Sequence, residues 1–398
     1  MTVGQQKHHH LHRYTANSQM LCYEDVNILP MIGWISTARI LILIVIIVIA
    51  VLVIHRRTYH NYSVLSSSKN ENVQAYGFVQ FEDEILKYGT DGVSLVNQKE
   101  ETVWSEDFQM TNPTVDVCEN MAVVADKDAT SLYILSKEKV VGTVQTSKPI
   151  LKARVARTGV VAAILQDNDK TWVDFYAKDG SLIAENQTRI DSPGYPVDIA
   201  VSPNGKIIMV SYLYVEDAQT TSYVAFYNFG DSGQSEIDNI VSGYTYKDVI
   251  VPQTIYLKDG SALAFRDNGF SVYQGENIPK EKKNVEMTSE IVSTFYNDNY
   301  AGVVFKDKDN NKNYVMRVYS LNGKMKFEKK FNIEYTQIKI SNEMIIMNND
   351  TQVCMVDLNG NKKFDGNFGE GTIQGIFRIA SNRYMVVSES GIKTIKLK

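Results

Sequence analysis

Histidine is absent from most of this chain. All six histidines lie at positions 8, 9, 10, 12, 55 and 60, so residues 61–398 contain none. Ser-His-Asp and Cys-His catalysis both use histidine as the base, and many zinc, copper and iron sites use it as a ligand. The body of the chain therefore lacks these catalytic systems and histidine-ligated metals. It also has no glycine-rich phosphate loop, and we predict no cofactor.

Cysteine and basic charge are also scarce. The chain has three cysteines, Cys22, Cys118 and Cys354, with no CxxC pair, which excludes a disulfide framework and a structural zinc site. Cys118 and Cys354 stand in apolar runs, as buried thiols do. The formal net charge is -5, so the sequence lacks the basic character of nucleic-acid-binding proteins.

One long apolar run is present near the N-terminus. It extends from Ile40 to Ile54 without a polar residue. Extended back to Ile35 it reaches about 20 residues, the length that crosses about 30 Å of hydrocarbon. Arg39 would then lie close to one end, where its long side chain reaches the headgroups. We predict a transmembrane helix over residues 35–54, because such a dense run of Ile, Val and Leu favours a membrane span over a buried core helix.

The sequences that flank this run set the remaining N-terminal predictions. Residues 1–34 are predicted to form a largely disordered tail. His55-Arg56-Arg57 follows the run instead of a small-residue cleavage site, which favours an uncleaved single-span anchor over a signal peptide. Counting Lys and Arg on the two sides leaves the orientation open.

The stretch "PVDIAVSPNGKIIMVSYLYV", Pro196 to Val215, alternates apolar residues on both sides of an Asn-Gly pair. Asn-Gly between two alternating runs is the strongest short signal for a β-hairpin. Similar units recur along the chain. Their turns lie at Glu82-Asp83, Asn120, Gly159, Asn204-Gly205, Asp259-Gly260, Asp298-Asn299, Asn342 and Asn382.

These repeats decide the fold class. Their mean period is about 43 residues, within the range of about 40–45 that four-stranded propeller blades show. A third strand ending in an Asp-Gly or Asn-Gly turn and a more polar fourth strand follow each hairpin, as in "FYAKDG" and "VYSLNG". We predict an all-β fold, a β-propeller of about eight four-stranded blades over residues 55–398, with seven blades as the alternative count.

The last repeat is incomplete. The chain ends at "GIKTIKLK", which supplies only a third strand for the final blade. Residues 60–67, "HNYSVLSS", precede the first complete repeat and alternate in a suitable way. We expect this segment to pair with the C-terminal strand, residues 391–397, and to close the ring, because closure removes two exposed sheet edges.

Carboxylates offer the remaining route to catalysis. Acidic residues recur in the turn after the second strand of each repeat, at Asp91, Asp126, Asp128, Asp167, Asp169, Asp217, Asp267, Asp307, Asp309 and Asp350. Asp in such turns usually bonds its own backbone. No acid and nucleophile pair stands out, so we predict no catalytic residue and no metal site.

A candidate binding rim lies in "DSPGYP". Here Asp191, Tyr195 and Pro196 precede the first strand of a repeat, close to the mouth of the predicted channel. Aromatic residues at a propeller mouth either bind peptides or sugars or pack the rim. The composition leaves both roles open.

Several segments occur in a characteristic order: "LKYGTDGVSLVN", "NPTVDVCENMAVVADK", "SPGYPVDIAVSPNGKIIMVSYLYV" and "VAFYNFG". With the N-terminal span, the chain resembles a family of single-span, membrane-anchored, WD40-like propeller proteins of unknown function from Gram-positive bacteria. The resemblance implies a propeller displayed from the cell membrane, outside the cytoplasm, with the N-terminus inside. It implies no catalytic residues.

Together these observations predict a membrane-tethered, non-enzymatic binding or scaffolding module. Its partner would be a protein or a cell-wall polymer, with no role for nucleic acid. The alternative is a carboxylate-dependent glycan hydrolase or lyase at the cell surface. It requires two carboxyl groups facing each other about 5–10 Å apart across a cleft.

Overall fold

The computed structural model describes residues 40–49, 53, 57–69, 75–99, 101–188, 194–310, 312–369 and 371–398. The chain divides into two units, Met1–Arg57 and Thr58–Lys398. In the first unit, the described residues 40–49 are apolar and α-helical.

The predicted span is only partly covered by the described residues. Ile35, Arg39 and Ile54 lie outside them, as does the predicted tail, residues 1–34. Within the described part of the chain, no helix is both long and apolar enough to cross a bilayer.

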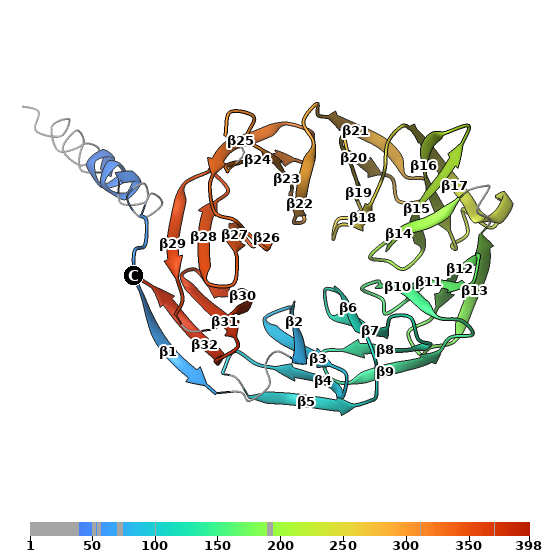
Figure 1. Ribbon diagram of the computed structural model, residues 1–398, viewed down its shortest axis with the longest axis horizontal. Helices are drawn as coiled ribbons and strands as arrows, with labels where there is room; N and C mark the ends of the chain where they lie inside the picture. Colours follow the sequence, from blue (N-terminus) through green and yellow to red (C-terminus); the bar gives the residue numbers. More distant parts are fainter. Residues whose placement is uncertain are drawn as a thin grey trace, which may run out of the picture. The chain divides into compact units, whose positions relative to one another are not determined.

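The second unit contains eight four-stranded antiparallel sheets, which surround a central opening (Figure 1). This confirms the prediction of an all-β propeller and gives eight blades rather than seven. Blade 1 consists of β2 (Tyr76–Phe81), β3 (Glu84–Gly89), β4 (Gly92–Val96) and β5 (Thr102–Asp107). Blade 2 consists of β6 (Pro113–Cys118), β7 (Met121–Asp126), β8 (Ser131–Ser136) and β9 (Val140–Gln145). Blade 3 consists of β10 (Ile150–Val155), β11 (Val161–Asp167), β12 (Lys170–Tyr176) and β13 (Leu182–Thr188).

The next four blades follow in chain order. Blade 4 consists of β14 (Tyr195–Val201), β15 (Ile207–Glu216), β16 (Gln219–Asn228) and β17 (Ile240–Lys247), with a short 3-10 helix, η2 (Ile237–Asn239), before β17. Blade 5 consists of β18 (Gln253–Tyr256), β19 (Ala262–Arg266), β20 (Gly269–Gln274) and β21 (Lys280–Glu286). Blade 6 consists of β22 (Ile291–Tyr296), β23 (Tyr300–Lys306), β24 (Tyr314–Ser320) and β25 (Met325–Phe331). Blade 7 consists of β26 (Gln337–Ser341), β27 (Met344–Asn348), β28 (Gln352–Asp357) and β29 (Lys362–Asn367).

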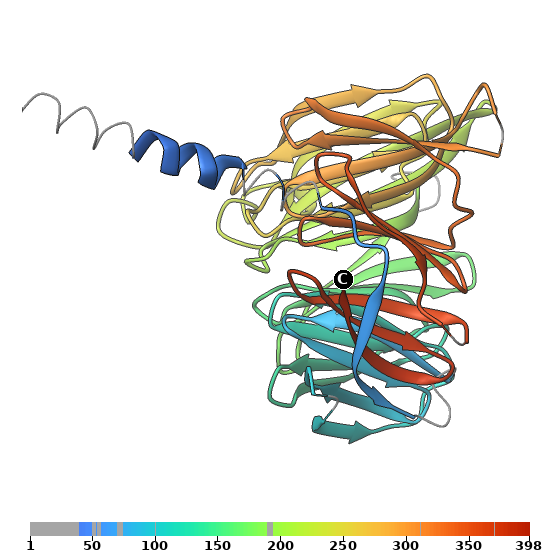
Figure 2. The same ribbon diagram turned by 90° about the vertical axis from the view of Figure 1, so that its left-hand side faces the viewer.

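Blade 8 combines both ends of the second unit. Its strands are β30 (Ile373–Ala380), β31 (Arg383–Ser388), β32 (Gly391–Leu397) and, on the outside, β1 (Tyr62–Ser68). β1 pairs antiparallel with β32 from Tyr62 opposite Leu397 to Ser68 opposite Ile392. Figure 2 shows β1 beside the C-terminal strands. The last blade thus takes its fourth strand from the start of the unit, which leaves no open end in the ring.

Burial falls from the second strand of a blade to the fourth. In β7 every residue is buried, whereas in β5 only Trp104 is partly buried. The hydrophobic core lies between neighbouring blades. One cluster joins blades 2 and 3 through Val123, Leu132, Leu165 and Trp172. Strands covered on both faces by adjacent blades become apolar, and outer strands stay polar.

The Asn-Gly hairpin of blade 4 shows how the turn chemistry works. Gly205 adopts a φ of 71°, in the left-handed region that favours glycine. Asn204 Oδ1 accepts a hydrogen bond from Ser202 Oγ at 2.7 Å and one from the Lys206 N–H at 3.1 Å. A Cβ on Gly205 would lie 2.4 Å from Thr158 Oγ1 of blade 3. The turn therefore needs glycine for its conformation and for the close approach of the neighbouring blade.

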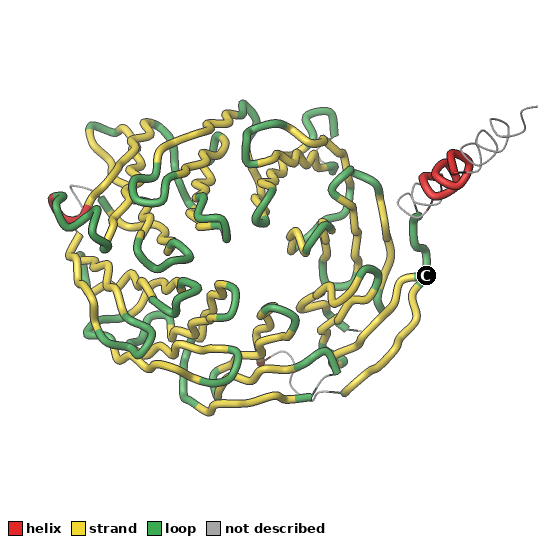
Figure 3. The backbone as a smooth tube through the Cα atoms, turned by 180° about the vertical axis from the view of Figure 1, so that it is seen from behind, coloured by secondary structure: helices red, strands yellow, loops and turns green. Residues whose placement is uncertain are grey.

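The antiparallel pairing sorts the turns onto two faces of the ring. Turns that join the first and second strands of each blade lie on one face, which we call the inner-hairpin face, and turns that join the third and fourth strands lie there too. Turns between second and third strands lie on the opposite face. Figure 3 shows the ring from behind, with loops joining the strands of each blade.

Candidate binding site at the channel mouth

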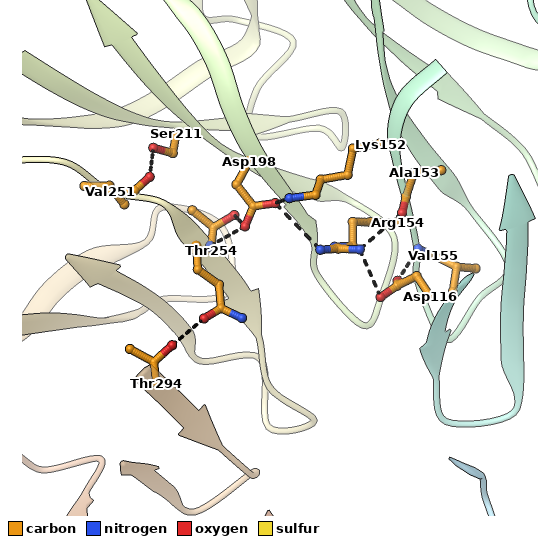
Figure 4. Close-up of polar contacts among 11 residues, drawn as sticks. Asp116, Lys152, Ala153, Arg154, Val155, Asp198, Ser211, Val251, Thr254 and Thr294 are labelled. Atoms are coloured by element: carbon orange, nitrogen blue, oxygen red, sulfur yellow. Dashed lines mark hydrogen bonds and ion pairs between the residues drawn. The ribbon is translucent and has the colours of Figure 1, made fainter. Parts of the chain in front are cut away.

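Charged residues from neighbouring first strands meet in the central channel. Arg154 on β10 lies between Asp116 on β6 and Asp198 on β14 (Figure 4). Its guanidinium nitrogens are 3.6 Å from Asp116 Oδ1 and 3.7 Å from Asp198 Oδ1. Lys152 and Arg154 are two residues apart on β10, so both side chains lie on the same face of the strand and reach Asp198 of the next blade. The arginine thereby links three successive blades.

Asp198 is the most heavily coordinated carboxylate of this network. Its side chain is fully buried, and its Oδ1 lies 2.6 Å from Lys152 Nζ. Its Oδ2 accepts a hydrogen bond of 2.6 Å from the Thr254 N–H on β18, in blade 5. In the same blade Gln253 Oε1 accepts a 2.9 Å bond from Thr294 Oγ1 on β22. The polar chain therefore runs across the first strands of blades 2 to 6.

The electrostatic environment of Asp116 differs from that of Asp198. Burial raises its pKa, against the lowering effects of Arg154 and of the Val155 N–H, which donates a 2.9 Å hydrogen bond to Oδ2. The adjoining cavity is about 110 Å³ and is lined in part by Arg154, Thr254 and Tyr296. This is below the roughly 300 Å³ at which ligand pockets begin. Arg154 lies between the carboxylates of Asp116 and Asp198, in the place that the sugar would occupy in a glycosidase.

A much larger cavity opens at the channel mouth, on the inner-hairpin face. Its volume is about 900 Å³, within the range of ligand pockets. Five inner hairpins contribute to it, from blades 1, 2, 5, 6 and 7. Its lining residues are Phe78, Val79, Gln80, Glu82, Val117, Glu119, Lys258, Asn297, Asp298, Asn299, Tyr300, Lys339, Ile340, Ser341, Asn342, Glu343, Leu358 and Phe377. We call this the mouth cavity.

The strand residues of the mouth cavity are mainly apolar, with one lysine among them. Phe78, Val117, Ile340 and Phe377 come from β2, β6, β26 and β30. Lys339 is the neighbour of Ile340 on β26, and its Nζ lies 4.4 Å from the centre of the Phe377 ring. Burial lowers the pKa of Lys339 to about 8. The amine has lost part of its contact with water, and the Phe377 ring face is the cation–π contact that it has gained among the described residues.

The rim of the mouth cavity is acidic, but most of its carboxylates carry a basic partner. Glu82 lies 3.1 Å from Lys137 Nζ of blade 2. Glu119 lies 3.3 Å from Arg157 of blade 3.

A third pair, between Asp298 of blade 6 and Lys258 of blade 5, spans 3.4 Å. These ion pairs join hairpin turns of adjacent blades and hold the rim in shape. Within the described residues, no group of three or more His, Cys, Asp and Glu side chains has the geometry of a metal site.

The predicted rim around Tyr195 lies at the start of β14, away from the inner-hairpin face. The Tyr195 hydroxyl donates a 2.8 Å hydrogen bond to Gln166 Oε1 of blade 3, and Pro196 is buried. Asp191 lies outside the described residues. Tyr195 therefore joins two blades in this structure.

Sequence reasoning did not single out Lys339 or the hairpin residues that surround it. A signal was available, because a charged residue inside an apolar first strand marks a side chain that faces the channel. The segments "PTVDVC", "ILKARV", "PVDIAV" and "QIKIS" all show it. Only the fold reveals that no carboxylate of the described residues lies within 4.0 Å of Lys339 Nζ, whereas Lys152 and Arg154 both lie beside Asp198.

One protein-family model matches most of the chain. A model described as "Family of unknown function (DUF5711)" matches residues 55–397. No curated protein matches the chain.

Solved structures share the fold. BamB from Moraxella catarrhalis is 12% identical with a TM-score of 0.51, over 85% of this chain and 98% of that one. Sqt1 from Chaetomium thermophilum is 11% identical with a TM-score of 0.51, over 85% and 97%. At such identities the likeness concerns the fold alone.

Proposed function

We propose that this chain, which belongs to the DUF5711 family of unknown function, is a non-enzymatic binding or scaffolding propeller that takes its ligand at the channel mouth. The observation that carries the proposal is the mouth cavity, with its volume of about 900 Å³ and hairpins from five blades. Propellers of this kind offer a rigid ring, so a ligand meets a surface that is already formed.

The chemistry of the cavity favours binding over catalysis. Glu82, Glu119 and Asp298 each contact a lysine or arginine within 3.4 Å. Their carboxylate oxygens are thus engaged in ion pairs that join neighbouring hairpins of the rim. Deeper in the channel, Arg154 separates the carboxylates of Asp116 and Asp198. These arrangements argue against the glycan hydrolase or lyase alternative, which needs one protonated and one ionised carboxyl group across an open cleft.

The proposal includes a membrane tether. The apolar run from Ile40 to Ile54 supports a single span, with the propeller outside the cytoplasm and the N-terminus inside. The chain enters the propeller on the inner-hairpin face. There Thr58 Oγ1 donates a 3.0 Å hydrogen bond to the Lys362 carbonyl, beside the turn that begins β29. Thr58, the first residue of the second unit, therefore lies on the inner-hairpin face, and the ligand would be a protein or a cell-wall polymer.

The test uses the full-length chain in its own membranes with a cross-linker. Asn299 and Glu343 are exposed residues of two different hairpins that line the cavity. The double variant Asn299→Trp, Glu343→Trp should fill the mouth and abolish capture of the partner. Lys308→Trp, an exposed residue in a turn on the opposite face, should leave capture unchanged.

Two results would overturn the proposal. One is capture that survives filling of the mouth but disappears with Lys308→Trp, which would move the site to the opposite face. The other is release of soluble fragments when the purified chain is incubated with cell-wall glycans, lost in the double variant. That result would establish the enzymatic alternative.

A further inference from the structure

We infer that the mouth cavity binds the carboxyl terminus of a peptide chain that ends in an apolar residue, with the carboxylate placed against Lys339. This inference deepens the proposed function and rests on it. It names the class of ligand and the residue that recognises its charge.

The first step is the unmatched charge of Lys339. Among the described residues, no carboxylate lies within 4.0 Å of its Nζ. In the part of the chain that the structure describes, three other cations lie on first strands. Lys152 and Arg154 lie beside Asp198, and Arg378 on β30 donates a 3.0 Å hydrogen bond to the Ser381 carbonyl. A cation without a counterion in an apolar wall attracts an anion strongly, because little water competes for it there.

The second step is the kind of anion. A single lysine supplies one positive charge, and a carboxylate matches it. Phosphate esters carry more charge and prefer the fork of an arginine or several donors. The rim adds Glu82, Glu119, Asp298 and Glu343, and among the described residues no basic side chain lies within 4.0 Å of the Glu343 carboxylate. This acidic rim repels a dianion more than a monoanion.

The third step is the body of the ligand. Phe377 lies beside Lys339, and Phe78 and Val117 line the same cavity, so its wall suits an apolar side chain next to the carboxylate. Farther out, Asn342 on a hairpin turn offers a side-chain amide that suits a peptide backbone. A small carboxylic acid would fill only part of about 900 Å³, whereas a chain end of several residues would use both zones.

The binding should also depend on pH. Because burial lowers the pKa of Lys339 to about 8, its ammonium form is present at pH 7 and is lost as the pH rises above 8. The other titratable groups lining the cavity are Glu82, Glu119, Lys258, Asp298, Tyr300 and Glu343. An arginine at position 339 keeps its charge throughout this range, so it separates the effect of Lys339 from the effects of these groups.

The experiment measures fluorescence anisotropy with the full-length chain in detergent. The probes are hexapeptides ending in phenylalanine, leucine or serine, each as the free acid and as the amide. Free acids with an apolar end should bind, and amidation should weaken binding about tenfold or more, the usual range for a hydrogen bond to a charged group. Phenylacetate and inorganic phosphate serve as competitors that separate a free acid or an anion from a chain end.

The variants identify the residue. Lys339→Met should lose affinity for the free acid by about ten- to hundredfold and leave the weak binding of the amide unchanged. Lys339→Arg should retain binding and remove its decline between pH 7 and pH 9.5. Lys308→Met is the matched control, because this lysine is exposed in the turn between β23 and β24 on the opposite face. It should lower affinity less than threefold.

Three results would overturn the inference: equal affinity for acid and amide, an unchanged affinity in Lys339→Met, or stronger competition by phosphate than by the peptide acid. Failure here is distinguishable from failure of the proposed function. If no peptide binds while the tryptophan double variant still abolishes partner capture, the mouth remains the site and the ligand belongs to another class, such as a wall polymer. If the tryptophan double variant also captures the partner as well as the wild-type protein does, both proposals are wrong.

Discussion

Tyr62 lies directly opposite Leu397 in the antiparallel pair of β1 and β32, so the first strand of the propeller is bonded to the last. This pairing closes the ring of eight sheets. It joins the segments that are farthest apart in the sequence of the unit, and every blade then has two neighbours. The stability of the whole ring should depend on this one strand pair, because opening it would expose two sheet edges and the apolar faces behind them.

A cysteine pair tests the register of the closure. Ser63 lies opposite Lys396, so Ser63→Cys with Lys396→Cys should form a disulfide on mild oxidation, since opposite residues have Cβ atoms about 4.5–5.5 Å apart. Ser63→Cys with Lys393→Cys is the control, because Lys393 lies opposite Ser67 and is out of reach. Mass spectrometry of unreduced tryptic digests measures both. Equal cross-linking in the two variants would contradict this register.

A pair of glycines separates backbone strain from steric clash in the turns. Gly205 and Gly260 occupy equivalent turns with φ of 71° and 82°, but a Cβ on Gly260 meets nothing within 4 Å. Gly260→Ala should therefore lower the free energy of unfolding by about 1 kcal/mol, because alanine is strained at a positive φ. Gly205→Ala should cost about 1–2 kcal/mol more, because its Cβ would press on Thr158 Oγ1 and Val160. Denaturant midpoints measure the difference, and equal losses would show that Thr158 moves away without cost.

Those turns also explain why the fold could be predicted. Each Asn-Gly or Asp-Gly pair constrains its own backbone, so a local pattern repeated at one period reports the blades directly. The pairing of β1 with β32 was accessible for a similar reason, since the chain ends after three strands of the last blade. Local chemistry and repetition were enough for both.

The site could not be predicted in the same way. The contact between Lys339 and Phe377 joins blades 7 and 8, and that between Arg154 and Asp198 joins blades 3 and 4. Such contacts depend on the rotation between blades, which no turn signal encodes. The rim prediction around Tyr195 used proline and tyrosine spacing, and this spacing did not reveal that the hydroxyl bonds to Gln166.

Neutralising Asp198 should damage the channel network more than neutralising Asp116. Asp198→Asn leaves Lys152 and Arg154 without their shared counterion and should cost about 3 kcal/mol, as breaking a buried pair does. Asp116→Asn should cost less, because burial already disfavours the charged form of Asp116. The two denaturant midpoints at pH 7 measure the ranking, and a larger loss for Asp116→Asn would contradict it.

The stability of the propeller should also depend on pH through Asp116. Burial raises its pKa, so the folded state binds a proton more readily than the unfolded state. The stability that this group contributes is present at low pH and is lost as the pH rises through the raised value. The cost of Asp116→Asn should therefore be larger at pH 4 than at pH 7. Thermal unfolding of both proteins at the two pH values measures it, and the opposite trend would show that Arg154 dominates.

The proposed tether predicts how the chain partitions. Full-length protein should remain in the membrane pellet after high-salt and alkaline washes and should dissolve only in detergent. Ile44→Asp with Ile47→Asp should move it to the soluble fraction, because each charge at the centre of a span costs about 3 kcal/mol. Val64→Asp, at a half-exposed position of β1, should not.

Orientation is tested with the same protein. Protease added to intact cells should cut the propeller while a cytoplasmic marker stays whole. A propeller that is protected while known surface proteins are trimmed would place it inside the cell.

The charged form of Lys339 should lower the stability of the propeller. Its pKa is lowered to about 8 in the folded state, so between pH 8 and its ordinary range the unfolded chain binds more protons. Stability must then rise with pH over that window, and the charged amine is a net cost below pH 8. Lowering a pKa by one corresponds to about 1.4 kcal/mol, so Lys339→Met should gain on the order of 2 kcal/mol at pH 7, with partial access to water reducing the full amount.

The gain of Lys339→Met should shrink as the pH rises from 8 to 10, since the wild-type amine is by then neutral. Lys339→Arg should show no such recovery, because its charge persists. Chemical denaturation at pH 7, 8.5 and 10 distinguishes the three proteins. A methionine variant that is less stable than wild type at pH 7 would mean that the lysine has a counterion in the folded protein. A Lys339→Met variant that is more stable but binds no free-acid peptide would show that Lys339 lowers the stability of the propeller and is needed for ligand binding. This trade-off is common at binding residues.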